Sequence, residues 1–248
     1  VQERLDHHGH VIEPLDDASV DAAVRAVEAG GYESVAVALL HAYANPAHEQ
    51  AVGRALAKRL PDIPVTLAAS ISPKFREYER TSTAVANAYV RPIVDKYVQR
   101  LEGALKGHVF QKSMFIMQSA GGLVSPEIAR EQPVRIVESG PAAGVLLAAM
   151  VGAEEGADHV ITFDMGGTTA KLGAVDNGEP AVTPTFEVDP VRYRPGSGLP
   201  INVPAVELLE IGAGGGSIAR VDLGVIHVGP ESAGADPGPI CYGRGGIE

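Results

Sequence analysis

An α/β fold is predicted for this chain of 248 residues. In the first half, apolar strand-like runs alternate with helical patterns, which is typical of α/β layers with a parallel sheet. Three later apolar runs end in glycine-rich turns. After Gly178, prolines and glycines become dense and helical periodicity disappears. This change predicts an irregular, β-rich C-terminal region that folds against the helical layers.

The N-terminal part predicts two helices and two strands. Asp16 or Asp17 can cap a helix over residues 16–29, and Gly30-Gly31 stops it. The apolar run 34–41 predicts a buried strand. Asn45-Pro46 opens a second helix that extends to about residue 60, and a short strand is expected at 65–69.

The middle of the chain predicts a long helix followed by three strands. The helical pattern covers residues 77–105, with Pro92 expected to kink or split it. Strands are expected at 113–118, 133–138 and 159–164, with a small apolar helix at 142–151. In open α/β sheets, ligands gather beyond the carboxyl ends of such strands. Short β pieces are expected near 182–188 and 206–212.

Composition and charge exclude several classes of protein. With 45 % hydrophobic and 21 % charged residues, the chain is an ordinary globular protein. The formal charge of −11 and the absence of a basic patch argue against nucleic acid and anionic membranes as partners. The apolar runs are too short to span a bilayer. Cys241 is the only cysteine, which excludes an intramolecular disulfide and favours a cytoplasmic location.

The strongest local feature is the segment 159–175, where an apolar strand delivers Asp164 to a Gly-Gly-Thr turn and a second strand-like run leaves it. Glycines at 166 and 167 allow backbone amides to approach phosphate oxygens closely, and threonines at 168 and 169 add hydroxyl donors. Asp164 can hold Mg²⁺ through waters or orient an attacking water. An ordinary hairpin with a Gly-Gly turn is the alternative.

Several longer motifs extend over nearly the whole chain in a recognisable order. They cover residues 77–85, 87–89, 117–122, 139–144, 164–169, 212–219 and 229–239. Together they resemble the A subunit of the hydantoinase/5-oxoprolinase family, which includes acetone-carboxylase-type ATP-binding subunits. This family lies within the actin/hexokinase/heat-shock-chaperone ATPase superfamily. The resemblance implies ribonuclease H-like layers, with residues 1–72 ending an N-terminal domain and 73–248 forming part of the core domain.

The resemblance implies ATP and Mg²⁺ as cofactors and a small cyclic amide or carbonyl compound as substrate. ATP would phosphorylate an amide or enol oxygen, so that ring opening or carboxylation can follow. A hydantoinase B-type subunit or domain is the implied partner. The main prediction is ATP-dependent hydrolysis of a hydantoin or 5-oxoproline type of amide. The alternatives are an acetone-carboxylase-type carboxylase subunit, a non-catalytic actin-like nucleotide-binding module, and an inactive protein that has the fold but lacks a competent cleft.

The implied roles fall on three groups of residues. Asp164 and Lys171 are the catalytic candidates, and Asp164 is also the metal ligand. Arg80 and Ser119 are the substrate-binding candidates, although a solvated helix salt bridge is an alternative for Arg80. The cofactor-binding candidates are Gly166, Gly167, Thr168, Thr169, Gly140, Gly214 and Gly215.

Two of the glycine-rich candidates have structural alternatives. Gly140 stands at an expected helix start, where free amides favour an anion, but a plain helix start would have the same sequence. The run Gly212–Gly216 lacks the third glycine of a dinucleotide fingerprint, because Ser217 replaces it and no helix pattern follows. Close approach to a nucleotide and a tight structural turn are both open there.

The chain also departs from the family pattern. Many members continue the Gly-Gly-Thr turn with Ser-Thr-Asp, whereas here Thr169-Ala170-Lys171 places a cation where a carboxylate is usual. Ala120 replaces an asparagine. A first Asp-x-Gly-Gly-Thr motif is missing, so the chain is expected to be an internal fragment that holds one side of an ATP cleft.

Overall fold

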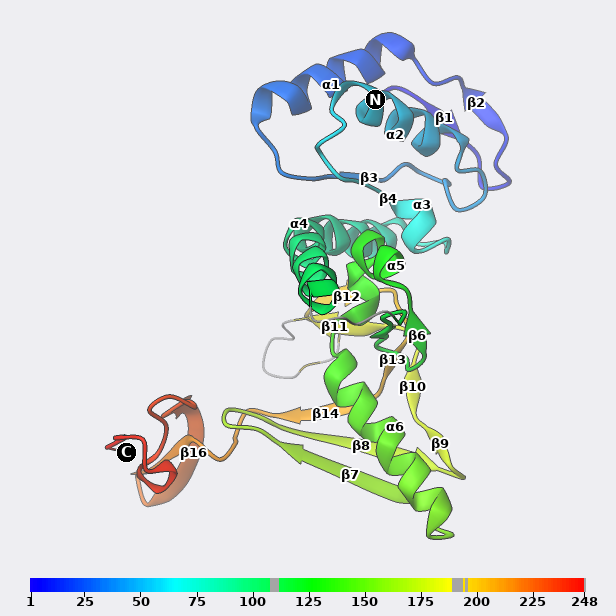
Figure 1. Ribbon diagram of the computed structural model, residues 1–248. Helices are drawn as coiled ribbons and strands as arrows, with labels where there is room; N and C mark the ends of the chain where they lie inside the picture. The colour runs from blue at the N-terminus through cyan, green and yellow to red at the C-terminus, as the bar shows by residue number, and fades with distance from the viewer. Residues whose placement is uncertain (108–111, 189–193, 195, 248) are drawn as a thin grey trace. The chain divides into compact units, whose positions relative to one another are not determined.

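The computed structural model describes residues 1–107, 112–188, 194 and 196–247 (Figure 1). The chain forms two compact units. Unit 1 comprises Val1–Val137 and Pro184–Ala205, and unit 2 comprises Glu138–Thr183 and Val206–Glu248. The family resemblance implies a division at residue 72, which separates two segments of the family's sequence. The compact units are instead divided at residues 137/138, 183/184 and 205/206.

The N-terminal part of unit 1 is an α/β layer. Its elements are β1 (Arg4–Leu5), β2 (Val11–Glu13), α1 (Asp17–Gly30), β3 (Val35–Val37), α2 (Ala47–Arg59), β4 (Val65–Leu67) and α3 (Ala68–Ile71). Asp16 caps α1 by accepting a hydrogen bond from the Ser19 amide at 2.9 Å. Because β3 and β4 pair in parallel, the predicted strand–helix–strand arrangement is confirmed, with shorter strands than expected.

The layer packs around an aliphatic core and one buried carboxylate. Val24, Val37 and Leu56 belong to the core cluster. Glu49 on α2 is fully buried and accepts hydrogen bonds from the amides of Leu39 and Ala69, both at 2.9 Å. Burial raises the pKa of Glu49, and the two amides oppose that shift. Glu49 thus ties α2 to the segments that follow both parallel strands.

The rest of unit 1 is arranged around α4 (Glu77–Gly107), which runs continuously through Pro92. The predicted helix is confirmed, and Pro92 does not split it. The remaining elements are β5 (Ile116–Met117), β6 (Leu123–Val124), α5 (Pro126–Glu131), η1 (Pro133–Ile136), β11 (Phe186–Val188) and β12 (Leu199–Ile201). Ile71, Val134, Ile201 and Val203 form a second core cluster.

The prediction of a strand at 133–138 is wrong, because η1 is a 3₁₀-helix. Pro133 has no amide to donate to a ladder. The amide of Val134 donates to the side-chain oxygen of Asn87 at 3.2 Å, and the amide of Arg135 donates to the Gln132 carbonyl at 3.0 Å. Val134 is buried, so the apolar pattern there reports burial in the core and not an extended backbone. The strand expected at 113–118 is also shorter, since β5 has two residues.

Unit 2 is built on one helix and an antiparallel sheet. Figure 1 shows α6 (Ser139–Glu154) lying along the sheet, whose strand order is β14-β8-β7 with β9 paired to β8. The strands are β7 (Val160–Met165), β8 (Ala170–Asp176), β9 (Glu179–Pro180) and β14 (Leu208–Ile211). Val145 and Ala149 of α6 pack against Val175 and Val206. The helix begins earlier than the predicted residue 142, and the antiparallel pairing of β7 with β8 is the hairpin that the sequence predicted.

The C-terminal region is β-rich, as predicted, and the α/β fold class is confirmed. Its antiparallel hairpin pairs β15 (Ser217–Asp222) with β16 (Val225–Ser232). The short strands β10 (Val182–Thr183) and β13 (Ala205–Val206) and the 3₁₀-helix η3 (Ile240–Tyr242) complete the chain. No helix in the described part of the chain is long and apolar enough to cross a membrane.

Candidate functional site

The predicted phosphate hairpin joins β7 to β8 in unit 2. Met165 pairs with Ala170, and the amide of Gly166 closes the turn by donating to the Thr169 carbonyl at 2.9 Å. The amides of Gly167 and Thr168 make no hydrogen bond to any described residue. Two amide donors at the tip of a glycine turn are therefore available to an anion.

A second glycine-rich turn, at residues 212–216, is hydrogen-bonded to the backbone of the hairpin. The amide of Gly215 donates to the Gly166 carbonyl at 2.9 Å, and the amide of Gly216 donates to the Gly167 carbonyl at 2.7 Å. A Cβ on Gly214 would stand 2.6 Å from the Gly166 carbonyl oxygen, so only glycine permits this approach. The 212–216 run is thus a structural turn that orients the hairpin. Gly214 and Gly215 were predicted to bind the cofactor, but their amides donate to Ser217 and Gly166.

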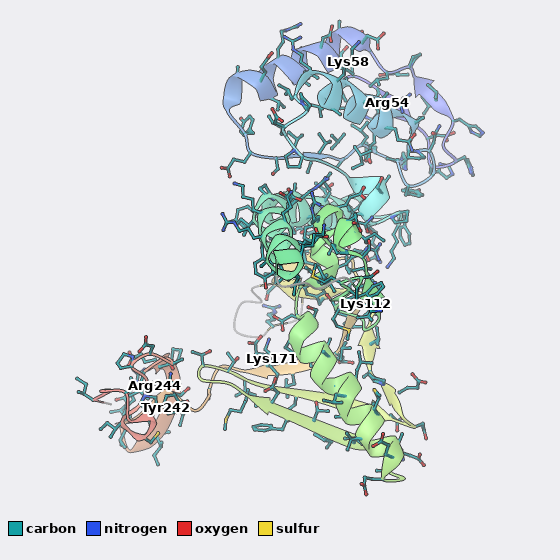
Figure 2. All side chains as sticks on the ribbon, viewed as in Figure 1. Arg54, Lys58, Lys112, Lys171, Tyr242 and Arg244 are labelled. Atoms are coloured by element: carbon teal, nitrogen blue, oxygen red, sulfur yellow. The ribbon has the colours of Figure 1, made fainter. Side chains whose placement is uncertain are left out.

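Charged side chains form a row across the sheet on the face that α6 covers. Lys171 stands opposite Asp164 on β7 and opposite Glu210 on β14. Its ammonium group pairs with Glu138, the residue before α6, and lies 3.7 Å from the Glu210 carboxylate. Figure 2 shows Lys171 near the start of α6. Burial alone would lower the pKa of Lys171, but the hydrogen bond and charge of Glu138, together with the charge of Glu210, raise it. Lys171 is therefore a protonated cation and not a general base at neutral pH.

Asp164 differs from Lys171 in having no partner. Its side chain is exposed, and the structure records neither an ion pair nor a hydrogen bond for its carboxylate within the described residues. An exposed carboxylate at a strand end can accept a hydrated Mg²⁺, which typically binds proteins through one or two carboxylates and several waters. No group of three or more metal-binding side chains occurs among residues that the structure describes.

The site includes a cavity of about 210 Å³ between α6 and the sheet. Asp164 and Lys171 line it from the sheet, and Pro141 and Gly144 line it from the helix. Glu138, the N-cap residue of α6, makes no side-chain capping bond. The first-turn amides of α6, including that of Gly140, therefore carry the partial positive charge that favours an anion. Gly140 and the hairpin, which were both predicted to bind the cofactor, lie in the same unit.

The two substrate-binding candidates lie in unit 1, and both are buried. The guanidinium group of Arg80 donates to the carbonyls of Leu39 at 2.7 Å and Lys74 at 3.1 Å. The hydroxyl of Ser119 donates to the carbonyls of Arg135 and Val137. Each side chain is 1 % exposed, so the solvated salt bridge considered for Arg80 is wrong. Substrate binding by either residue stays a prediction that this geometry does not favour.

Glu138 and Glu210 were not among the candidate site residues. Strand register places Glu210 beside Lys171, and the start of α6 brings Glu138 to the same ammonium group. The serines of the C-terminal region were also missed. Ser217 accepts the amide of Gly214 at 2.8 Å, and Ser232 accepts the amide of Gly234 at 3.1 Å. Serines within glycine-rich turns are the signal that could have identified them.

The fold and the site define an α/β unit with an aspartate at the base of a glycine-rich hairpin. The family comparisons identify it further. The hydantoinase/oxoprolinase family model matches residues 80–248, and the model of the family's N-terminal region matches residues 1–60. The chain therefore belongs to the hydantoinase/oxoprolinase family.

Several relatives have names that describe their chemistry. The caprolactamase α subunit of Pseudomonas jessenii is 37 % identical over 99 % of this chain and 34 % of its own length. The 5-oxoprolinase of Saccharomyces cerevisiae is 32 % identical over 95 % of this chain and 18 % of its own length. The chain thus spans about a third or less of the length of these two proteins.

Two solved structures share the fold. The crystal structure of the ATP-dependent caprolactamase from P. jessenii has a TM-score of 0.79 and 37 % identity, covering 99 % of this chain and 35 % of the matched chain. A nucleotide-free acetone carboxylase structure has a TM-score of 0.75 and 28 % identity, covering 94 % of this chain and 32 % of the matched chain.

Proposed function

We propose that the full-length protein uses ATP to hydrolyse a small cyclic amide of the hydantoin or 5-oxoproline type. The proposal rests on one observation: Asp164 stands at the base of a hairpin, and within the part of the chain that the structure describes neither its carboxylate nor the tip amides have a hydrogen-bond partner. The names of two relatives, caprolactamase and 5-oxoprolinase, indicate cyclic amides as their substrates. The active protein is proposed to be a cytoplasmic hetero-oligomer with a B-type subunit, since several relatives are named as subunits.

The donor set fits a nucleotide phosphate with Mg²⁺. The amides of Gly167 and Thr168 and the hydroxyls of Thr168 and Thr169 would hold phosphate oxygens. Gly166 shapes the turn, and Gly140 adds the α6 N-terminus. Asp164 would hold Mg²⁺ through water, which leaves the metal free to neutralise phosphate charge. When bound, ATP supplies a phosphoryl group that converts a poor amide leaving group into a good one.

Lys171 is proposed to act as a positioning charge. Its ammonium group stays protonated because Glu138 and Glu210 hold it. It also occupies the position directly opposite Asp164 in the sheet. This pairing keeps a cation close to the Asp164 carboxylate without neutralising that carboxylate, so Asp164 remains available to the metal.

A carboxylase is the second candidate. The acetone carboxylase structure shares the fold, and the acetophenone carboxylase γ subunit of Aromatoleum aromaticum is 32 % identical over all of this chain. Both reactions need the same phosphate site, so the hairpin does not distinguish them. A non-catalytic actin-like nucleotide module would bind ATP without any substrate-stimulated turnover.

The test measures ATP hydrolysis by the full-length protein with its partner subunit. We expect hydantoin or 5-oxoproline to stimulate hydrolysis, and Asp164→Asn to abolish that stimulation. Asp176→Asn is the matched control, because Asp176 ends the strand that follows the hairpin and makes only an exposed pair with His159 at 2.7 Å. Stimulation by acetone with bicarbonate would favour the carboxylase. Full activity in Asp164→Asn would refute the role of Asp164.

A further inference from the structure

A second cavity, of about 530 Å³, lies entirely within unit 1. The segment that precedes α4 forms one wall, with Lys74, Phe75 and Tyr78. The segment around β12 forms the other wall, with Gly198 and Asn202. Its volume falls in the range of small-molecule sites. None of the residues assigned to the phosphate site lines it.

Lys74 provides a positive charge that no carboxylate of the described residues neutralises. Its ammonium group donates to the side-chain oxygen of Asn202 at 3.1 Å. Asn202 is 8 % exposed and is held in place by Ser72 and Thr83, each through a hydrogen bond of 2.8 Å. Among the described residues, no carboxylate lies within ion-pair distance of Lys74. A rigid amide thus fixes an ammonium group whose charge remains available.

The other charges that line the cavity are already engaged. Arg76 pairs with Glu79 at 3.4 Å and lies 5.5 Å from the ring centroid of Phe75. Glu187 accepts the amides of Gly196 at 2.6 Å and Gly198 at 3.2 Å. A carboxylate that accepts two amides is stabilised within its own loop. Lys74 is therefore the lining cation whose ammonium group has hydrogen-bonding capacity left for an anion.

The same wall exposes two aromatic rings. Phe75 is 64 % exposed and Tyr78 is 66 % exposed. Arg76, between them in sequence, has a left-handed φ of 78° although it is not glycine. Such strain in a non-glycine residue persists only where surrounding contacts impose it, and here it accompanies the stacking of Arg76 on Phe75. Exposed rings next to a fixed cation suit a ligand with an apolar ring and an acidic group.

We propose that this cavity binds a ring-bearing carboxylate, with the carboxylate at Lys74 and the ring against Phe75 and Tyr78. The site goes beyond the proposed function, because it uses none of the phosphate-binding residues and requires no nucleotide. A bound carboxylate would complete the hydrogen-bonding capacity of the Lys74 ammonium, which has three donors. A neutral amide of the same shape would lack this charge-assisted contact.

The test titrates benzoate into the full-length protein without ATP, by isothermal titration calorimetry, alongside benzamide and acetate. We expect benzoate to bind with a Kd on the order of 1 mM, and benzamide and acetate to bind about tenfold more weakly. Lys74→Met is expected to weaken benzoate binding by about tenfold, whereas Lys74→Arg retains most of the affinity. Lys96→Met, at an exposed position of α4 outside the cavity, is the matched control.

The thermal midpoint of Lys74→Met should equal or lie slightly below that of Lys96→Met, because both positions are exposed but Lys74→Met also loses the hydrogen bond to Asn202. Equal affinity for benzoate and benzamide would overturn the proposal, as would unchanged benzoate binding in Lys74→Met. Failure to observe saturable benzoate binding would also refute it. None of these results affects ATP hydrolysis by the Asp164 site, so the two proposals fail independently.

Discussion

Replacing Gly214 with alanine tests whether the second glycine turn holds the phosphate hairpin in place. A Cβ at this position would stand 2.6 Å from the Gly166 carbonyl oxygen and 2.8 Å from both the Gly167 carbonyl carbon and the Thr168 amide nitrogen. All three atoms belong to the backbone, so no side-chain rotation can relieve the clash. The two turns must move apart.

The cost can be worked out from the contacts that separate. Two hydrogen bonds join the turns, from Gly215 to Gly166 and from Gly216 to Gly167. Each hydrogen bond contributes about 1 kcal/mol, so their loss makes the ordered conformation of the hairpin about 2 kcal/mol less stable. If ATP binding must restore that order, the Kd rises about thirtyfold. The thermal midpoint should also fall, because an overpacked contact destabilises the fold by about 1–3 kcal/mol.

The assay is calorimetric titration of ATP into the full-length protein, with thermal denaturation in parallel. Gly103→Ala serves as the control, since a Cβ at Gly103 in α4 would meet no atom within 4 Å. That variant should bind ATP normally and be as stable as the wild type or slightly more stable. Wild-type ATP affinity in Gly214→Ala would refute the view that the second turn orients the hairpin.

Two further predictions concern the packing and the charges of unit 2. Gly173→Ala should lower the free energy of unfolding by about 1–3 kcal/mol in urea titrations, because its Cβ would stand 2.5 Å from Val145 of α6; an unchanged midpoint would contradict this packing. Lys171→Met should lower stability by less than about 1 kcal/mol at neutral pH, since Glu138 and Glu210 are partly exposed. Because the folded-state pKa of Lys171 is raised, its contribution is complete below pH 10.5 and is lost as the pH rises through the folded-state value. The stability curves of wild type and variant should therefore converge at alkaline pH, and a difference that grows there would be inconsistent with the Glu138 pairing.

Local sequence determined the hairpin and the main helices. The alternation in 159–175, with two glycines at its centre, specifies two antiparallel strands and a turn without help from the rest of the chain. Asp16 and Gly31 likewise define α1 through capping chemistry that acts within a few residues. These features depend on neighbours in sequence, and their prediction was therefore reliable.

Only the tertiary structure decided the roles of residues that depend on distant partners. Arg80 was predicted to bind substrate, with a solvated salt bridge as the alternative, but it is buried and donates to the carbonyls of Leu39 and Lys74. Residues 133–138 read as a strand, but Asn87 accepts the Val134 amide and favours a 3₁₀ turn. The sequence of the 212–216 run left a nucleotide contact and a structural turn both open, and in the structure two of its amides donate to the hairpin. Long-range hydrogen bonds satisfy buried polar groups by proximity in space, and local periodicity does not report which groups come together.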